Sequence, residues 1–398
     1  MKHAFNEPAM ITSLLITDYR KQAAAFSYLL VFLRYMFYTG SYLIFIYGAY
    51  VLQYTDGTKQ EGAAAARRHV LFQNNRRKRA MNLHNSKVVI IGCGNVGATT
   101  AYSLVNQGIC EELVLIDVNR DKAYAEALDI QHSLYFMNRN ISVKTGDYRD
   151  CEDADIVVVT ASAPMPKDSH NRLEMLAPSM KIIRNIVQSV MSSGFSGIFI
   201  VVSNPVDIMS YYVWKLSGLP SAQIIGSGTA LDSARLCCGL SQLYDLDSKS
   251  VQSYILGEHG DTEFIAWSSA LIGGKYVSDV MADNTDRTRN VTRETLLKQT
   301  KEAGWEIFNR KGNTCYGIAS STTAIIKSIL FNENRILPVS VCLHGQYGLM
   351  DIFISVPTIL NKHGAREIIE IRLAEDEKEA LKNSAAAIRD FYKDLQIG

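Results

Sequence analysis

The sequence predicts an α/β protein, in which a parallel-sheet domain is followed by a mixed α+β domain and preceded by an apolar extension. Three observations predict this. From residue 87, short runs of β-branched residues alternate with helical patterns. A glycine-rich turn joins the first run to the first helix, and after about residue 226 helical patterns dominate. The predicted parts are therefore 1–85, 86–226 and 227–398.

Composition fits such a chain and excludes several classes of protein. The 398 residues suffice for two to three domains of about 150 residues each. Lys and Arg number 41 against 40 Asp and Glu, a balance that argues against a nucleic-acid-binding protein. With 47% hydrophobic and 20% charged residues, disorder throughout is excluded. Seven irregularly spaced cysteines predict no disulfide framework and a reducing, cytoplasmic compartment.

The extension over 1–85 has two interpretations. Residues 35–55 carry no charged side chain, and about 20 apolar residues can span a bilayer. More basic residues follow this run than precede it, so the positive-inside rule would keep the C-terminal bulk in the cytoplasm. The run is therefore either an N-terminal membrane anchor or the upstream translation of a gene that starts at Met81.

The first domain reads as strands alternating with helices. Residues 98–108 have helical spacing that stops at Gly108, and residues 172–194 form a long predicted helix that ends at Gly194 with Pro178 in its N-terminal half. Repeated strand–helix–strand units predict a parallel sheet with right-handed crossovers. The predicted strands lie in the runs 87–92, 112–117, 154–162 and 197–205.

The second domain reads as mixed. Two short β-rich runs stand out, over 250–257 and 349–360, among helical patterns. The last helix, over 376–395, is amphipathic and is predicted to pack four side chains inward: Leu381, Ala385, Ile388 and Phe391.

The turn after the first strand has the pattern G-x-G-x-x-G, formed by Gly92, Gly94 and Gly97. The first glycine permits the tight turn, the second lets the backbone approach a pyrophosphate, and the third lets helix and strand pack closely. Asp117 ends the second strand twenty residues past Gly97, where a carboxylate can bind ribose hydroxyls and repel a 2′-phosphate. The set predicts a Rossmann-type domain that binds NAD. A glycine-bearing turn in an unrelated α/β domain is the alternative.

A histidine, an aspartate and an arginine are the candidate catalytic groups. His259 lies in the sequence Gly-Glu-His-Gly-Asp, and Asp232 and Arg235 share one helix face at i, i+3. An aspartate can fix the histidine tautomer and raise its pKa, and an arginine can hold a carboxylate. A structural histidine beside a surface ion pair is the alternative. Asn204 follows a strand at the ligand-binding edge, or is simply a turn residue before proline.

Five motifs in order resemble the L-lactate and malate dehydrogenase family, and most of all its bacterial L-lactate and L-2-hydroxyisocaproate dehydrogenases. They are GCGNVG, LVLID, SNPVD, GSGTALDSAR and GEHGDTEF, and the resemblance runs from about Ser86 to the C-terminus. It implies reversible hydride transfer between NADH and a 2-oxo acid, with small-molecule substrates and a homodimer or homotetramer. It implies no metal site and no nucleic-acid partner.

The resemblance also implies a role for particular residues. His259 matches the proton donor and acceptor, Asp232 its partner, and Arg235 the residue that binds the substrate carboxylate. Arg172 matches the arginine of the mobile loop that polarises the ketone, and Thr314 a substrate-pocket threonine. The positions that match cofactor contacts are Val96, Asp117, Lys122, Tyr148 and Asn204.

The loop that sets substrate choice departs from the family pattern. Its discriminating position falls on Met165 or Pro166, neither of which can bind a second carboxylate. A flexible apolar methionine suits a bulky aliphatic 2-oxo acid such as 2-oxoisocaproate, with pyruvate as the alternative. Cys237 and Gln252 stand where an Arg and a His bind fructose 1,6-bisphosphate in relatives, so no activation by that sugar is expected.

Two rivals come from other classes. An NAD-dependent glycosidase would bind a metal through Cys and His, and Cys237 and Cys238 come nearest to such ligands. A non-catalytic NAD-binding protein, tethered to a membrane by residues 35–55, is the second. The set of His259, Asp232, Arg172 and Arg235 weighs against it.

Overall fold

The computed structural model describes residues 85–163 and 176–394, and the chain from residue 84 onward forms one compact unit. The apolar run over 35–55 and the start at Met81 lie outside the described residues. Within the two described ranges, no helix combines the length and the apolar composition needed to cross a bilayer.

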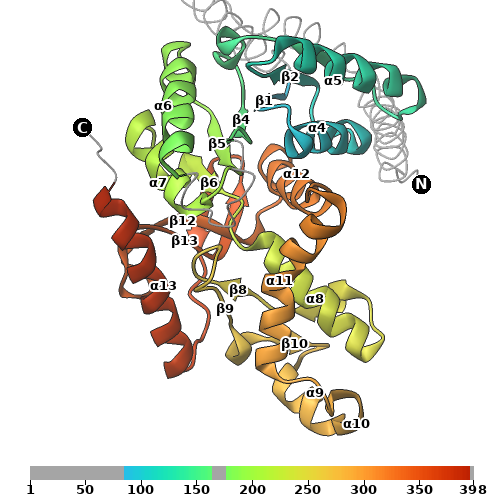
Figure 1. Cartoon of the computed structure of the whole chain (residues 1–398), viewed down its shortest axis with the longest axis vertical. Coiled ribbons are helices and arrows are strands. Elements are labelled where there is room, and N and C mark those ends of the chain that lie inside the picture. The colour runs from blue at the N-terminus through green and yellow to red at the C-terminus, as the bar shows by residue number, and fades with distance from the viewer. Residues whose placement is uncertain (1–84, 164–175, 395–398) are drawn as a thin grey trace, which may run out of the picture. The chain divides into compact units, whose positions relative to one another are not determined.

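The described residues contain a large mixed sheet of nine strands, in the order β14-β13-β12-β6-β5-β4-β1-β2-β3 (Figure 1). Its parallel part has the order 3-2-1-4-5-6 of a Rossmann sheet, which confirms the predicted fold class. That order reverses between β1 and β4, so ligands are expected at the carboxyl ends of these strands. The parallel strands are β1 (Lys87–Ile91), β2 (Glu112–Ile116), β3 (Ser142–Thr145), β4 (Ile156–Val159), β5 (Ile198–Val201) and β6 (Ile224–Gly226).

Helices cover both faces of this sheet, which explains its continuous apolar strands. Val88 and Ile90 of β1 belong to one core, whereas Val89 and Ile91 belong to the core on the opposite face. Figure 1 shows α4, α5 and α12 on one side of the sheet and α6 and α7 on the other. These helices are α4 (Asn95–Gln107), α5 (Arg120–Ser133), α6 (Leu176–Ser192), α7 (Val206–Ser217) and α12 (Tyr316–Leu330).

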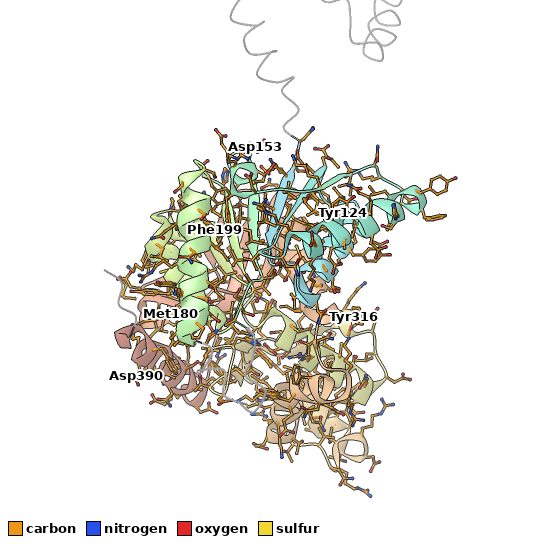
Figure 2. The ribbon with its side chains drawn as sticks, turned by 45° about the horizontal axis from the view of Figure 1, so that its top comes forward. Tyr124, Asp153, Met180, Phe199, Tyr316 and Asp390 are labelled. Atoms are coloured by element: carbon orange, nitrogen blue, oxygen red, sulfur yellow. The ribbon has the colours of Figure 1, made fainter. Side chains whose placement is uncertain are left out.

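Side chains show the same layering. Phe199 of β5 is fully buried inside the sheet, whereas Tyr124 on α5 and Tyr316 on α12 stand on exposed faces (Figure 2). Pro178 occupies the third position of the described part of α6, near its N-terminal end as predicted.

The second half of the chain extends the sheet and adds a helical layer. Strands β12 (Arg335–His344), β13 (Met350–Asn361) and β14 (Gly364–Ile368) run antiparallel, and β12 joins β6 through Ser340 and Gly226. A third core lies under α8 (Ala230–Tyr244). The remaining helices are α9 (Val277–Asp283), α10 (Thr285–Thr288), α11 (Arg293–Lys311) and α13 (Glu375–Asp394), and the short strands are β7 (Val251–Gln252), β8 (Ile255–Leu256), β9 (Phe264–Ile265), β10 (Leu271–Ile272) and β11 (Lys275–Tyr276).

The predicted elements of this half are present, but the sequence reading was incomplete. The run over 250–257 contains β7 and β8, and the run over 349–360 falls within β13. On α13, Leu381, Ala385 and Ile388 are buried and Phe391 is half-buried. The partner strand β12 was not predicted, although its ten residues complete the pairing of β13.

Candidate active site

The glycine turn after β1 has the geometry that its pattern predicts. Gly92 has a φ of +106°, and a Cβ added there would lie 2.7 Å from the backbone nitrogen of Ala161. A Cβ at Gly97 would collide with the carbonyl oxygen of Gly92, so helix and strand need that glycine to pack. Around Gly94, by contrast, no atom lies within 4 Å of an added Cβ. The turn is therefore tight on its inner side and open at its middle glycine.

The start of α4 is prepared for an anion. Among the described residues no side chain caps this helix, and its first turn holds no acidic residue. Its first N–H groups therefore stay available, and the helix dipole favours negative charge there. These features fit a dinucleotide pyrophosphate.

Asp117 follows β2 and lies beside this turn. Its Oδ2 accepts a hydrogen bond of 2.6 Å from the backbone N–H of Cys93, and its Oδ1 one of 2.8 Å from Asn119. Each carboxylate oxygen keeps a further lone pair, so the group can still accept from ribose hydroxyls. The carboxylate is thus fixed beside the glycine turn, and its contact with NAD stays a prediction.

The other cofactor candidates surround the same region. Val96 is half-buried on α4, and Lys122 is exposed on the first turn of α5. Tyr148, in the short helix η2 (Tyr148–Cys151), is half-buried, and its pKa is raised by burial with a smaller contribution from Asp117.

The structure brings His259, Asp232 and Arg235 together. Nδ1 of His259 lies 2.7 Å from Oδ2 of Asp232, and Nη1 of Arg235 donates to Oδ1 of the same carboxylate at 2.8 Å. Asp232, in the first turn of α8, is only 2% exposed. One buried carboxylate therefore connects both cationic candidates.

The charge state of Asp232 determines which nitrogen of His259 is available. Burial raises the pKa of Asp232, but the charges and hydrogen bonds of His259 and Arg235 outweigh burial, and the net pKa is lowered. The ionised carboxylate can only accept, so Nδ1 carries a hydrogen towards it. Nε2 is then the nitrogen positioned to exchange a proton with a substrate.

Two elements distant in sequence fix the loop that carries His259. Gly257, with a φ of +100°, exchanges backbone hydrogen bonds of 3.1 and 3.0 Å with Ser355 of β13. The backbone N–H of Glu258 donates to Oγ of Ser384 on α13 at 2.6 Å, and Ser384 is fully buried. The backbone of the loop is thus held against both β13 and α13 by contacts that do not involve the histidine side chain.

Asp207, on the first turn of α7, is a residue of the candidate site that was not predicted from the sequence. Its Oδ2 accepts from the backbone N–H of His259 at 2.8 Å, and its Oδ1 accepts from Oγ of Ser340 at 2.6 Å. Burial raises the pKa of Asp207 to about 6 despite these hydrogen bonds. Its place in the S-N-P-V-D motif was the available signal in the sequence. The burial of Asp207 and its hydrogen-bond partners depend on the tertiary fold, so the sequence alone did not reveal them.

Glu263 is the second missed residue. It is 4% exposed, and its carboxylate lies within 4.8 Å of ligand atoms of Asp232 and His259. Burial, with a contribution from Asp232, raises the pKa of Glu263 to about 8. It follows His259 closely in the sequence, which was the only available signal.

The substrate candidates divide into described and undescribed residues. The side chain of Arg235 is 18% exposed, and a Cβ added at Gly304 of α11 would lie 3.5 Å from its Nη2. Thr314 is half-buried between α11 and α12, and Asn204 is exposed just after β5. Three candidates lie outside the described residues: Met165, Pro166 and Arg172.

Two family models match almost the whole described chain. The lactate/malate dehydrogenase NAD binding domain matches residues 86–226, and the lactate/malate dehydrogenase alpha/beta C-terminal domain matches residues 229–395.

Individual relatives agree with these matches. L-lactate dehydrogenase 3 of Bacillus thuringiensis subsp. konkukian is 46% identical over 315 residues, which cover 79% of this chain and 99% of the relative. L-lactate dehydrogenase 1 of Bifidobacterium longum subsp. longum is 44% identical over 315 residues, with the same coverage. The crystal structure of the minor L-lactate dehydrogenase from Enterococcus mundtii, in its ligands-bound form, matches with a TM-score of 0.76 and 42% identity, over 79% of this chain and 100% of the other. The chain therefore belongs to the lactate/malate dehydrogenase family, as an NAD-dependent dehydrogenase.

Proposed function

We propose that this dehydrogenase reversibly reduces a 2-oxo acid to the L-2-hydroxy acid with NADH, and that pyruvate and L-lactate are its main pair. The main support for 2-oxo acid reduction is one buried cluster. In it, the carboxylate of Asp232 lies 2.7 Å from Nδ1 of His259 and 2.8 Å from Nη1 of Arg235. The names of the relatives, all L-lactate dehydrogenases, support pyruvate.

His259 would manage the proton of this reaction. With Nδ1 bound to ionised Asp232, an imidazolium can donate its Nε2 proton to the carbonyl oxygen, so that no free alkoxide forms. Bound NADH supplies the hydride that the carbonyl carbon receives. In the reverse direction neutral His259 takes the proton from the hydroxyl group.

Arg235 would anchor the substrate. Nη1 already donates to Asp232, and the guanidinium has four further N–H donors of its five for a substrate carboxylate. Asn204 and Thr314 would line the same pocket from the end of β5 and the α11–α12 junction. Arg172 would polarise the ketone oxygen, a role that stays a prediction because this residue lies outside the described part of the chain.

The bulky-substrate hypothesis is kept as the second candidate. It rests on Met165 or Pro166, and both positions lie outside the described residues. Turnover of the full chain with NADH on pyruvate, 2-oxoisocaproate, phenylpyruvate and oxaloacetate separates the candidates. We expect pyruvate to have the highest kcat/KM and oxaloacetate the lowest. A strong preference for 2-oxoisocaproate would replace pyruvate in the proposal, and no turnover on any 2-oxo acid would refute both candidates.

The quaternary and membrane predictions are separate from this chemistry. A homodimer or homotetramer and an N-terminal anchor stay predictions. Family membership favours the enzyme over the non-catalytic scaffold.

A further inference from the structure

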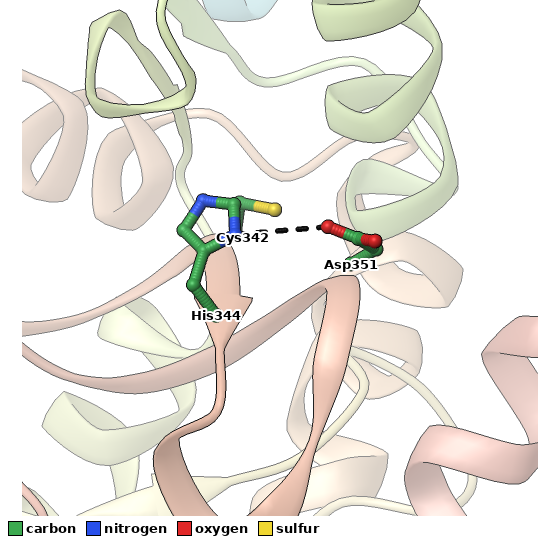
Figure 3. Close-up of side chains that lie close together, drawn as sticks. All are labelled: Cys342, His344 and Asp351. Carbon is green, nitrogen blue, oxygen red and sulfur yellow. Dashed lines mark ion pairs between the residues drawn. The ribbon is translucent and has the colours of Figure 1, made fainter.

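A second cluster of reactive side chains lies at the end of the β12–β13 hairpin. Cys342, His344 and Asp351 each offer a ligand atom, and these atoms all lie within 4.8 Å of one another (Figure 3). His344 contacts the Trp214 ring near the end of α7, whereas Asp207, which supports the catalytic loop, lies in the first turn of that helix. Seven residues separate the two, or about 10 Å along a helix. The cluster is therefore distinct from the catalytic site.

We propose that Cys342, His344 and Asp351 bind a zinc ion through the thiolate sulfur, Nδ1 and a carboxylate oxygen. Sulfur, imidazole nitrogen and carboxylate oxygen together are a ligand set typical of zinc. Water would complete a tetrahedral site.

The backbone places all three side chains on one side of the hairpin. Cys342 and His344 are two residues apart on β12, and side chains at that spacing share a face. A bulge follows Leu343, where the register passes from Ile352 directly to Met350. This leaves Asp351 as the extra residue on β13.

Asp351 adopts a backbone conformation that is uncommon for a residue with a side chain. Its φ is +51°, in the left-handed region, and its Oδ1 lies 3.6 Å from Nδ1 of His344. A bulge can redirect a side chain in this way. The irregular hairpin end thus directs the carboxylate towards the imidazole, as Figure 3 shows.

An independent contact orients His344 as a ligand. Its Nε2 lies 2.8 Å from Oγ of Ser221, in the short helix η4 (Ser221–Gln223). When Nε2 donates its hydrogen to this hydroxyl, Nδ1 presents a lone pair towards Cys342 and Asp351. Metal-binding histidines are typically fixed by a partner on the other ring nitrogen.

Only a small adjustment is needed to close the site. Zinc bonds of about 2.0–2.3 Å in a tetrahedron place ligand atoms roughly 3.5 Å apart. The side chains of His344 and Asp351 are 46% and 63% exposed, so an ion can approach from solvent and these side chains can rotate. The thiol of Cys342 would release its proton to solvent as the thiolate binds the ion.

The catalytic cluster is the competing metal site. Asp232, His259 and Glu263 also lie within 4.8 Å of one another. The guanidinium of Arg235, at 2.8 Å from Asp232, opposes a second cation there. In the hairpin cluster, the ion pair of the Asp351 carboxylate within the described ranges is with His344, itself a proposed ligand.

Metal titration of the full chain tests the proposal. The chain is stripped with chelator, and Zn²⁺ binding is measured by calorimetry and Co²⁺ binding by its thiolate charge-transfer absorption. We expect one site per chain, a sulfur-to-cobalt band, and a higher melting temperature with Zn²⁺. Cys342→Ser should remove the band and weaken binding about 100-fold, and Ser221→Ala should weaken it about tenfold.

Matched variants decide between the sites. His344→Gln changes a half-exposed side chain and should also weaken binding about 100-fold, which covers the case in which Cys342→Ser fails to fold. Cys238→Ser, at an exposed thiol on α8, should change neither metal binding nor NADH-dependent turnover. Binding that is lost in Glu263→Gln but kept in Cys342→Ser and His344→Gln would overturn the proposal. The absence of saturable binding below millimolar Zn²⁺ would overturn it as well.

Discussion

Asp232 links two side chains because each of its oxygens binds a different one. Oδ2 orients the ring of His259, and Oδ1 holds the guanidinium of Arg235. Burying an ionised carboxylate that is only 2% exposed costs folding free energy unless the charge is paired, and Asp232 has both partners. In the proposed function, proton transfer at His259 and substrate binding at Arg235 would therefore be coupled through one side chain.

Asp232→Asn should lower kcat for 2-oxo acid reduction by about 10²–10⁴-fold, because the neutral amide no longer stabilises an imidazolium at His259. Steady-state kinetics with NADH measure this loss. Asp261→Asn makes the same change at an exposed position two residues after His259 and should keep normal kcat. Equal rates in the two variants would contradict the assignment of Asp232.

Arg235→Lys should mainly raise KM for the 2-oxo acid, by about tenfold or more, because an ammonium cannot form the bidentate pair. The KM and kcat values of the variant and of the exposed control Arg310→Lys, on α11, provide the test. An unchanged KM in Arg235→Lys would count against a substrate carboxylate at this position.

At the scale of elements, the catalytic loop is fixed by strand and helix contacts that come from widely separated parts of the chain. Ser355 holds Gly257, Ser384 holds the backbone of Glu258, and Asp207 holds that of His259. The loop itself is short and glycine-bearing, so these contacts determine where the imidazole lies.

Ser340→Ala tests this support. It removes the hydroxyl that donates to buried Asp207 at 2.6 Å, and the loss should lower the free energy of unfolding by about 1–3 kcal/mol. Denaturant unfolding measures the change, with Ser192→Ala on the exposed face of α6 as a near-neutral control. A Ser340→Ala chain as stable as the control would show that the contact does not support the loop.

The elements also show what the sequence could predict. Strands β1, β2, β4 and β5 are buried on both faces, so their apolar runs could be recognised in the sequence without knowing their neighbouring strands. Strands β3 and β6 are short, and β12 joins the parallel sheet through a single pair, Ser340 with Gly226. Their existence depends on pairing between distant segments, which one sequence does not reveal.

The candidate site divides in the same way. His259, Asp232 and Arg235 were predicted together because their motifs resemble those of a known family, and the structure brings them together. Asp207 and Glu263 were missed because their importance comes from burial, which depends on the tertiary fold.

For the whole molecule, two buried acids make stability depend on pH. Burial raises the pKa of Asp207 to about 6 and that of Glu263 to about 8, above their ordinary values of 3.8 and 4.5. A raised pKa in the folded state stabilises the protein fully below the ordinary pKa, and this contribution is lost as pH rises through the folded value. The contribution of Asp207 is therefore lost as the pH rises from about 4 to about 6, and that of Glu263 as the pH rises from about 4.5 to about 8.

Glu263→Gln should remove the larger part of this pH-dependent loss of stability, because glutamine keeps the shape of the protonated acid but cannot ionise. Relative to the unmodified chain, its free energy of unfolding should be similar near pH 5 and higher by about 1–4 kcal/mol near pH 9. Denaturant unfolding across this range measures the difference. Glu302→Gln, at an exposed position on α11, should show no such trend, and a flat difference for Glu263→Gln would refute the buried acid.

The central claim is that the imidazole of His259, held by Asp232, moves the proton during NADH-dependent reduction of a 2-oxo acid. The most direct measurement is pyruvate turnover by His259→Ala, with NADH binding followed separately by fluorescence. We expect turnover at least about 10²-fold lower with NADH binding retained. Full turnover in this variant would show that His259 does not move the proton.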